Sequence, residues 1–186
     1  MRPMGEDDPF DSVLSIHDRL PLRWSVAEPP GDEGMARINE ANESLLRVCA
    51  SLDDTAPHTV EEAGELSHEL QRIESKLNVL VEMVGSLLHS QVQLPPAVSM
   101  CIASTGLAWE CQEQVPPGTG LHLHWYLCPH FPRPLELFAR SCAAPGEGIT
   151  ARFEGLSPQV EDGIQKMVFR RHRRSIAQSR ARRRTD

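Results

Sequence analysis

The chain has 186 residues, a formal net charge of -7 and 40% hydrophobic residues, enough for one domain with a long appendage or for two small domains. It holds no apolar run of about 18 residues, and its acidic N-terminus lacks the apolar core of a signal peptide, so we expect no membrane span and no leader. Five scattered cysteines, an odd number, indicate reduced thiols rather than a disulfide framework, and we expect a cytoplasmic protein.

Residues 1–18 are polar and contain few core-forming side chains, so we expect them to be loosely ordered. Residues 19–27 are predicted to form a first strand, because apolar residues alternate along it. These residues are Leu20, Leu22, Trp24 and Val26. The proline- and glycine-rich segment Glu28–Gly34 ends this strand.

Residues 35–91 are predicted to form an inserted helical hairpin. Apolar residues recur along its first helix at spacings of three and four: Ile38, Ala41, Leu45, Val48 and Leu52. The second helix is expected over residues 59–90, with Thr59 as N-cap and Glu61 and Glu62 in its first turn. At about 1.5 Å per residue, such a helix is about 45 Å long.

An unbroken heptad seam runs along this second helix. The a positions are Ala63, Leu70, Leu77 and Val84, and the d positions are Leu66, Ile73, Leu80 and Leu87. Further apolar residues beside the seam widen the stripe beyond what two strands would bury, which favours a bundle. We therefore predict a coiled coil that assembles a homotetramer. The alternative is an amphipathic helix packed on its own domain.

From Pro95-Pro96 onward the sequence pattern changes, and residues 95–156 contain short strand-like runs separated by glycine and proline. The runs are 97–102, 107–111, 121–127, 135–141 and 149–153. Together with the first strand they make six antiparallel strands, and so small a sheet hides its edges by closing into a barrel. The predicted fold class is therefore α+β, a six-stranded antiparallel β-barrel interrupted by the helical hairpin.

Residues 157–186 are predicted to form a last helix and a basic tail. Ser157 and Pro158 provide an N-cap and a first-turn proline, and Val160, Ile164 and Val168 provide an apolar stripe. The acids of the chain gather in its first 75 residues, so an acidic body carries this basic end.

Five stretches, in this order, resemble the PilZ family and in particular its atypical, tetramer-forming branch. They are Leu20-Pro-Leu-Arg-Trp24, Gln71-Arg-Ile-Glu-Ser-Lys-Leu77, Ile102-Ala-Ser-Thr-Gly-Leu-Ala-Trp109, Pro134-Leu-Glu-Leu-Phe-Ala-Arg140 and Phe153-Glu-Gly-Leu156. The resemblance covers nearly the whole chain after residue 15. It implies a PilZ-like barrel, a long helix that assembles four chains, and a family role as receptor for the bacterial second messenger cyclic di-GMP.

The resemblance also implies where a ligand would bind. Binding members of the family carry Arg-x-x-x-Arg before the first strand and Asp/Asn-x-Ser-x-x-Gly on the barrel. Here Arg19 stands alone, Cys101 and Ala103 occupy the acid and serine positions, Ser104 is one residue out of register, and Gly106 is retained. Each lost charged or polar contact costs roughly 1.5–3 kcal/mol, so we expect direct nucleotide binding to be weak or absent.

Arg170-Arg-His-Arg-Arg174 offers two arginines at i and i+4, which could share a helical face and grip a phosphate. One alternative is therefore a genuine cyclic di-GMP receptor that uses Arg19, Arg170 and Arg174. A second is an oligomeric nucleic-acid binder working through the basic tail, which the acidic body disfavours. The arginines also fit a solvated helix end or a docking surface for an acidic protein.

His122 and His124 lie on one face of a predicted strand, with Cys128 and His130 shortly after, a pattern that can bind a metal ion such as zinc. Because no carboxylate lies nearby in the sequence, we expect no metal site. No Ser-His-Asp order, phosphate loop or paired-carboxylate pattern is present, so we expect no catalytic residues and no cofactor. The sequence thus predicts a non-catalytic regulatory module that interacts with a protein partner in cyclic di-GMP signalling.

Overall fold

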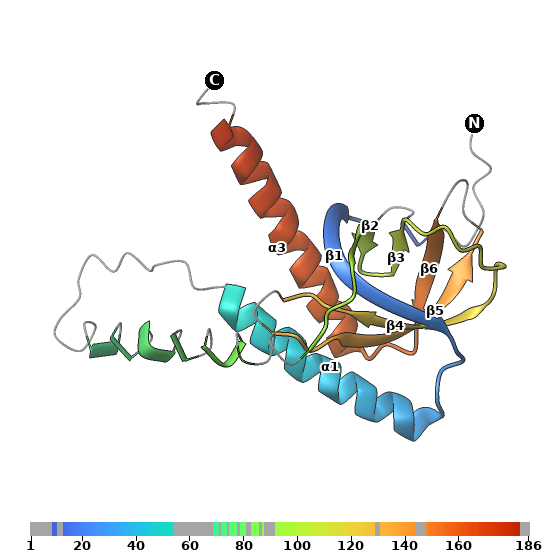
Figure 1. Cartoon of the computed structure of the whole chain (residues 1–186), viewed down its shortest axis with the longest axis horizontal. Helices are drawn as coiled ribbons and strands as arrows, with labels where there is room; N and C mark the ends of the chain where they lie inside the picture. The colour runs from blue at the N-terminus through green and yellow to red at the C-terminus, as the bar shows by residue number, and fades with distance from the viewer. Residues whose placement is uncertain are drawn as a thin grey trace.

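A computed structural model describes most of the chain as a closed barrel with helices (Figure 1). The described residues are 9–10, 13–53, 69–70, 72–73, 75–77, 79–80, 83–85, 87, 92–128, 131–143 and 148–182. In chain order the elements are β1 (Ser15–Val26), α1 (Asp32–Asp53), β2 (Ala97–Ala103), β3 (Gly106–Trp109), β4 (Gly120–Trp125), β5 (Leu135–Cys142), β6 (Ile149–Glu154) and α3 (Pro158–Arg182). No helix among these residues is both long enough and apolar enough to cross a membrane.

The six strands close in the order β1-β2-β3-β6-β5-β4, and every neighbouring pair is antiparallel. β1 is long enough to serve two neighbours, because its first part pairs with β2 and its second part pairs with β4. The exchange takes place at Pro21, which has no N–H to donate to either ladder. The predicted six-stranded antiparallel barrel is therefore confirmed.

Strand alternation fills the barrel with apolar side chains and leaves polar ones outside. On β4, Leu121, Leu123 and Trp125 are fully buried, whereas His122 and His124 between them are half-buried on the outer face. The other strands supply Ile16, Leu22, Ile102, Leu107, Leu135, Leu137, Ile149 and Ala151 to the same core.

The helix α3 packs against the barrel through the stripe that the sequence predicts. Val160, Ile164 and Val168 are all buried, and the Val160 N–H donates to Ser157 Oγ at 3.2 Å, which confirms Ser157 as the N-cap. A side chain at Gly163 would place its Cβ 2.8 Å from Leu46 Cδ1, so glycine here permits the close approach of α1. Beyond this contact, α3 extends away from the barrel (Figure 1).

The buried face of α1 is partly polar. Asn39 Nδ2 donates to the Gly155 carbonyl at 2.8 Å. Asn42 Nδ2 donates to the Glu136 carbonyl at 2.6 Å, and Asn42 Oδ1 accepts from the Glu136 N–H at 3.1 Å. β6 ends at Glu154, which pairs with Phe138, so Glu136 of β5 lies beyond the β5–β6 ladder. The side chain of Asn42 is the hydrogen-bond partner of the Glu136 backbone instead. Both asparagines are buried, so α1 is fixed to the barrel by hydrogen bonds as well as by apolar contacts.

Three sequence expectations need correction. Val48, which we placed in the apolar stripe of the first helix, is exposed, because the buried face turns toward Asn39 and Asn42 instead. β1 begins at Ser15 rather than residue 19, since Ile16 is buried and residues 15–18 pair with β2. The helix α1 begins at Asp32 rather than residue 35, with acidic side chains in its first turn, where they interact well with the helix dipole.

The described residues between 69 and 87 are all helical and extend to one side of the barrel (Figure 1). Within them, the six described seam positions are between 50% and 62% exposed in the single chain. These positions are Leu70, Ile73, Leu77, Leu80, Val84 and Leu87. The predicted seam residues Ala63 and Leu66 lie outside the described residues.

Candidate functional site

A pocket of about 660 Å³ lies between α3, the end of α1, the segment before β1 and the turn between β2 and β3. Its walls are mainly apolar, with a few polar groups. The lining residues are Val13, Leu14, Ala50, Ser104, Asp162, Gln165, Lys166, Val168, Phe169 and Arg170. An apolar hollow with a small number of converging polar groups is the usual form of a ligand site.

The pocket brings together two of the five residues that the sequence nominated as ligand contacts. Ser104 from the β2–β3 turn and Arg170 from α3 both line it, although 66 positions separate them in the chain. Arg19 does not line it: its backbone pairs with Ser99, and its Nε donates to the Ala97 carbonyl at 3.3 Å. Arg174 lies one turn beyond Arg170 on α3 and is exposed outside the pocket.

Gly106, the fifth nominated residue, is covered by the chain itself. A Cβ added at this position would lie 2.7 Å from Pro9 Cβ and would also clash with the Ala151 carbonyl on β6. The hydroxyl of Thr105 donates to the Pro9 carbonyl and holds this segment in place. The glycine therefore admits Pro9, which is fully buried, at the point where a ligand would need close access.

The charges of the pocket are few and partly neutralised. Asp162 and Lys166 form an ion pair of 2.7 Å one turn apart on α3. Arg170 directs Nη1 at the Ala50 carbonyl at the end of α1, at 3.4 Å. The lining side chains thus carry one net positive charge, whereas a ligand with two phosphates is bound best by two arginine forks.

The next residue, Arg171, also forms its contacts within the fold. Arg171 Nη1 forms an ion pair with Asp18 of β1, and its Nη2 donates to the Leu127 carbonyl at 2.7 Å. Arg173 lies over the Phe169 ring, with its guanidinium carbon 5.9 Å from the centroid. The basic run of α3 therefore serves in part to attach the helix to the acidic N-terminal half of the chain.

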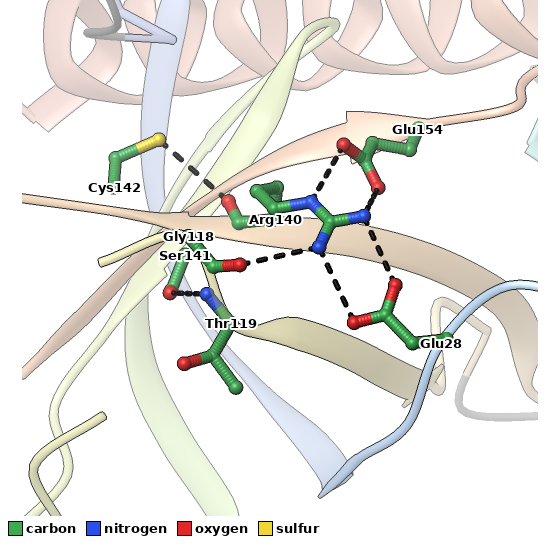
Figure 2. Close-up of polar contacts among 7 residues, drawn as sticks. All are labelled: Glu28, Gly118, Thr119, Arg140, Ser141, Cys142 and Glu154. Atoms are coloured by element: carbon green, nitrogen blue, oxygen red, sulfur yellow. Dashed lines mark hydrogen bonds and ion pairs between the residues drawn. The ribbon is translucent and has the colours of Figure 1, made fainter. Parts of the chain in front are cut away.

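Arg140 on β5 forms a second polar centre, which no sequence pattern predicts (Figure 2). Its Nε and Nη2 donate to both carboxylate oxygens of Glu154 at 2.9 Å, and Nη1 and Nη2 donate to Glu28 at 3.3 and 3.1 Å. Nη1 also donates to the Gly118 carbonyl at 3.1 Å. These contacts use all five N–H groups of the guanidinium, and the two carboxylates raise the pKa of Arg140.

This saturated arginine has a structural role. It links β5 to β6 through Glu154, to the β1–α1 connection through Glu28 and to the β3–β4 loop through Gly118. Gly120 makes room for the carboxylate of Glu28, because a Cβ there would lie 2.6 Å from Glu28 Oε1. The signal that could have found this centre was its place in two of the motifs that carry the family resemblance, which end with Arg140 and include Glu154.

Two histidines form a third group on the outer face of β4. The rings of His122 and His124 lie 4.4 Å apart between centroids, and His122 stacks on Phe138 of β5 at 4.5 Å. Burial lowers the pKa of His124. Electrostatic interaction with His122 and Arg23 lowers this pKa further, whereas the interaction with Glu136 acts in the opposite direction. Nothing in the described residues links this group to the pocket between α1 and α3.

Comparison with known proteins agrees with this geometry. The family model described as "atypical PilZ domain, cyclic di-GMP receptor" matches residues 46–182. Among solved structures, the chain resembles a pathogenic protein from Xanthomonas campestris, described as a tetrameric PilZ domain self-assembled via a helical bundle. That match has a TM-score of 0.73 and 27% sequence identity, and it covers 90% of this chain and 93% of the other. No curated protein matches the chain.

Proposed function

Because the chain belongs to the atypical PilZ domain family, we propose that it is a non-catalytic regulatory module of cyclic di-GMP signalling. In this proposal four copies assemble through the inserted helix, the barrel presents a surface to a protein partner, and direct nucleotide binding is weak or absent. The observation that carries the proposal is the exposed heptad seam, because its apolar side chains are in contact with solvent in a single chain.

The seam supports self-association on energetic grounds. Six apolar side chains spaced three and four apart are each at least half exposed, so water contacts a stripe of apolar side chains along these described helical residues. Val79 and Met83 beside it are exposed as well, which widens the stripe beyond the two positions per heptad of a two-stranded coil. A bundle of helices buries such a stripe, and the Xanthomonas relative is described as tetrameric through a helical bundle.

The pocket supports weak nucleotide binding. Ser104 and Arg170 are the nominated polar residues within it, Lys166 is paired with Asp162, and Gly106 is covered by Pro9. A dinucleotide would therefore find one arginine for two phosphates. The missing charged contacts, at about 1.5–3 kcal/mol each, would weaken binding at least tenfold per contact.

A direct receptor is the second candidate, and one observation favours it. Ser104 and Arg170, distant in the sequence, converge on one pocket of about 660 Å³ that opens beside the barrel. In this alternative Arg170 would replace the arginine pair that binding members carry before the first strand.

One experiment separates the two candidates. Cyclic di-GMP is titrated by calorimetry into the full chain at low salt, and the mass of the same sample is measured by light scattering. A tetramer that releases no heat supports the proposal, whereas saturable micromolar heat that is lost in Arg170→Ala supports the receptor. Arg173→Ala, which lies outside the pocket, is the matched control. A monomer at working concentrations would contradict the assembly part of the proposal.

A further inference from the structure

The barrel carries a cluster of metal-ligating side chains on its outer face. His122 and His124 from β4 and Glu136 from β5 offer ligand atoms that all lie within 4.8 Å of one another. The sequence predicts no metal site here, because no carboxylate lies nearby along the chain. Strand pairing supplies one, since Glu136 lies directly opposite His124 in the ladder between β4 and β5.

The strand register fixes these three side chains on one face. His122 and His124 are two positions apart on β4, so both point outward while Leu121, Leu123 and Trp125 point into the core. The N–H and the carbonyl of Glu136 both form hydrogen bonds with the side chain of Asn42, on the side away from β4. Glu136 and His124 are therefore a non-hydrogen-bonded pair of the ladder, the kind in which opposing side chains approach closest.

Two of the side chains are already held in place. His122 is stacked flat on Phe138, with an interplanar angle of 1°, and its Nε2 lies 2.9 Å from Glu136 Oε1. The backbone of Glu136 is fixed between β4 and α1, so its carboxylate starts from a defined position. All three side chains are partly buried and keep some exposure, so water or an ion can reach them from the solvent.

We propose that His122, His124 and Glu136 bind one divalent transition-metal ion, with zinc as the preferred class, and leave a fourth position for water. Two imidazoles and a carboxylate suit zinc better than magnesium or calcium, which prefer oxygen ligands. Zinc bonds of about 2.0–2.2 Å place neighbouring ligand atoms roughly 3.3 Å apart, so small side-chain rotations from the observed positions complete the site. When the ion binds Nε2 of the neutral His122 ring, it takes the place of the hydrogen bond to Glu136, and the single ring proton sits on Nδ1.

The strongest opposing feature is Arg23, which pairs with His124 on the β1 side and brings a positive charge to the same face. Glu136 offsets that charge when it ligates the ion. The competing interpretation is a plain hydrogen bond between a surface histidine and a carboxylate. The two interpretations differ in what they predict for added metal.

An occupied site would have a structural consequence. The ion would join β4 to β5 at the residue whose backbone holds α1, so it would reinforce the junction between the barrel and the inserted helices. This inference does not depend on the proposed signalling function, because the cluster lies apart from the pocket that contains Arg170.

The test is a calorimetric titration of zinc into the full, chelator-treated chain with its cysteines kept reduced. We expect one ion per chain, and an affinity loss of more than about tenfold in His124→Ala and in Glu136→Gln, since even outer-shell changes cost that much. His17→Ala, an exposed histidine on β1, is the matched control and should bind zinc like the parent. Zinc binding that survives both ligand variants, or an absence of binding, would overturn the proposal.

Thiols are the main source of a false positive, because Cys101, Cys111 and Cys142 are partly accessible. Cobalt in place of zinc distinguishes them, since cobalt bound to thiolate gives a strong charge-transfer absorption and cobalt bound to imidazole and carboxylate does not. A cobalt spectrum without that absorption, lost in His124→Ala, supports the assigned ligands. A thiolate spectrum unchanged in His124→Ala would place the ion elsewhere and refute the assignment.

Discussion

Leu77 lies at the middle of the exposed seam, and Leu77→Asp tests the assembly of the protein most directly. Burying a leucine or isoleucine fully contributes about 1.5–3 kcal/mol. Since Leu77 and the other described seam residues are already about half covered, closing the seam contributes roughly 1 kcal/mol per side chain and ~6 kcal/mol per chain over six positions.

The substitution removes the contribution of Leu77 and adds a carboxylate at the same place. Taking that charge out of water costs several kcal/mol per chain, and in a tetramer four such charges enter the interface. The penalty therefore approaches the whole gain from closing the seam, and association also costs translational and rotational entropy. We expect the variant to be monomeric with an intact barrel.

Light scattering coupled to size exclusion measures this directly. With chains of 20.8 kDa, the parent should have a mass of about 83 kDa and the variant the mass of one chain. Ser75→Asp adds the same charge at the outermost heptad position, where the side chain is exposed, and should remain a tetramer. If Leu77→Asp keeps the parental mass, or if the parent is itself a monomer, the seam is not the interface.

Three further predictions concern the barrel. Asn42→Ala should lower the free energy of unfolding by ~1–3 kcal/mol in urea titrations, because it leaves the buried backbone groups of Glu136 without a partner. Glu40→Ala, at an exposed position of the same helix, should change the free energy of unfolding little. Equal unfolding curves for the two variants would show that the Asn42 hydrogen bonds do not stabilise the fold. Ile164→Ala should cost ~2–5 kcal/mol by the same measurement, against a small change for the half-exposed Ile176→Ala on the same helix. Arg140→Met should lower the thermal midpoint more at low salt than at high salt, and a loss independent of salt would argue against an electrostatic role.

The barrel was predictable because its strands are short alternating runs separated by glycine and proline. The apolar stripe of α3 was predictable for a related reason, since Val160, Ile164 and Val168 recur at the helical period and are all buried. Both patterns are local, so a single stretch of sequence contains the whole signal.

The features that escaped prediction depend on contacts between distant segments. Asn39 and Asn42 are polar, so periodicity assigns them to solvent, yet they bind backbone groups that β6 leaves open. Pro9 lies in a segment that looks unstructured, yet it fills the space above Gly106. In the candidate site, Ser104 and Arg170 were nominated separately, and only the packing of α3 beside the β2–β3 turn places them in one pocket.

The split pairing of β1 also determines in which order the barrel can assemble. Pro21 meets Ala97, 76 positions later, whereas Trp125 meets Leu135 only 10 positions later. Closing the longer loop costs about 1.8 kcal/mol more in chain entropy. The β4–β5 hairpin should therefore form early in folding, and the pairing of β1 with β2 should form late. Every turn of helix formed between these two strands shortens the effective loop. The helical residues between these strands, those of α1 and those described between 69 and 87, thereby act on the rate at which the barrel closes.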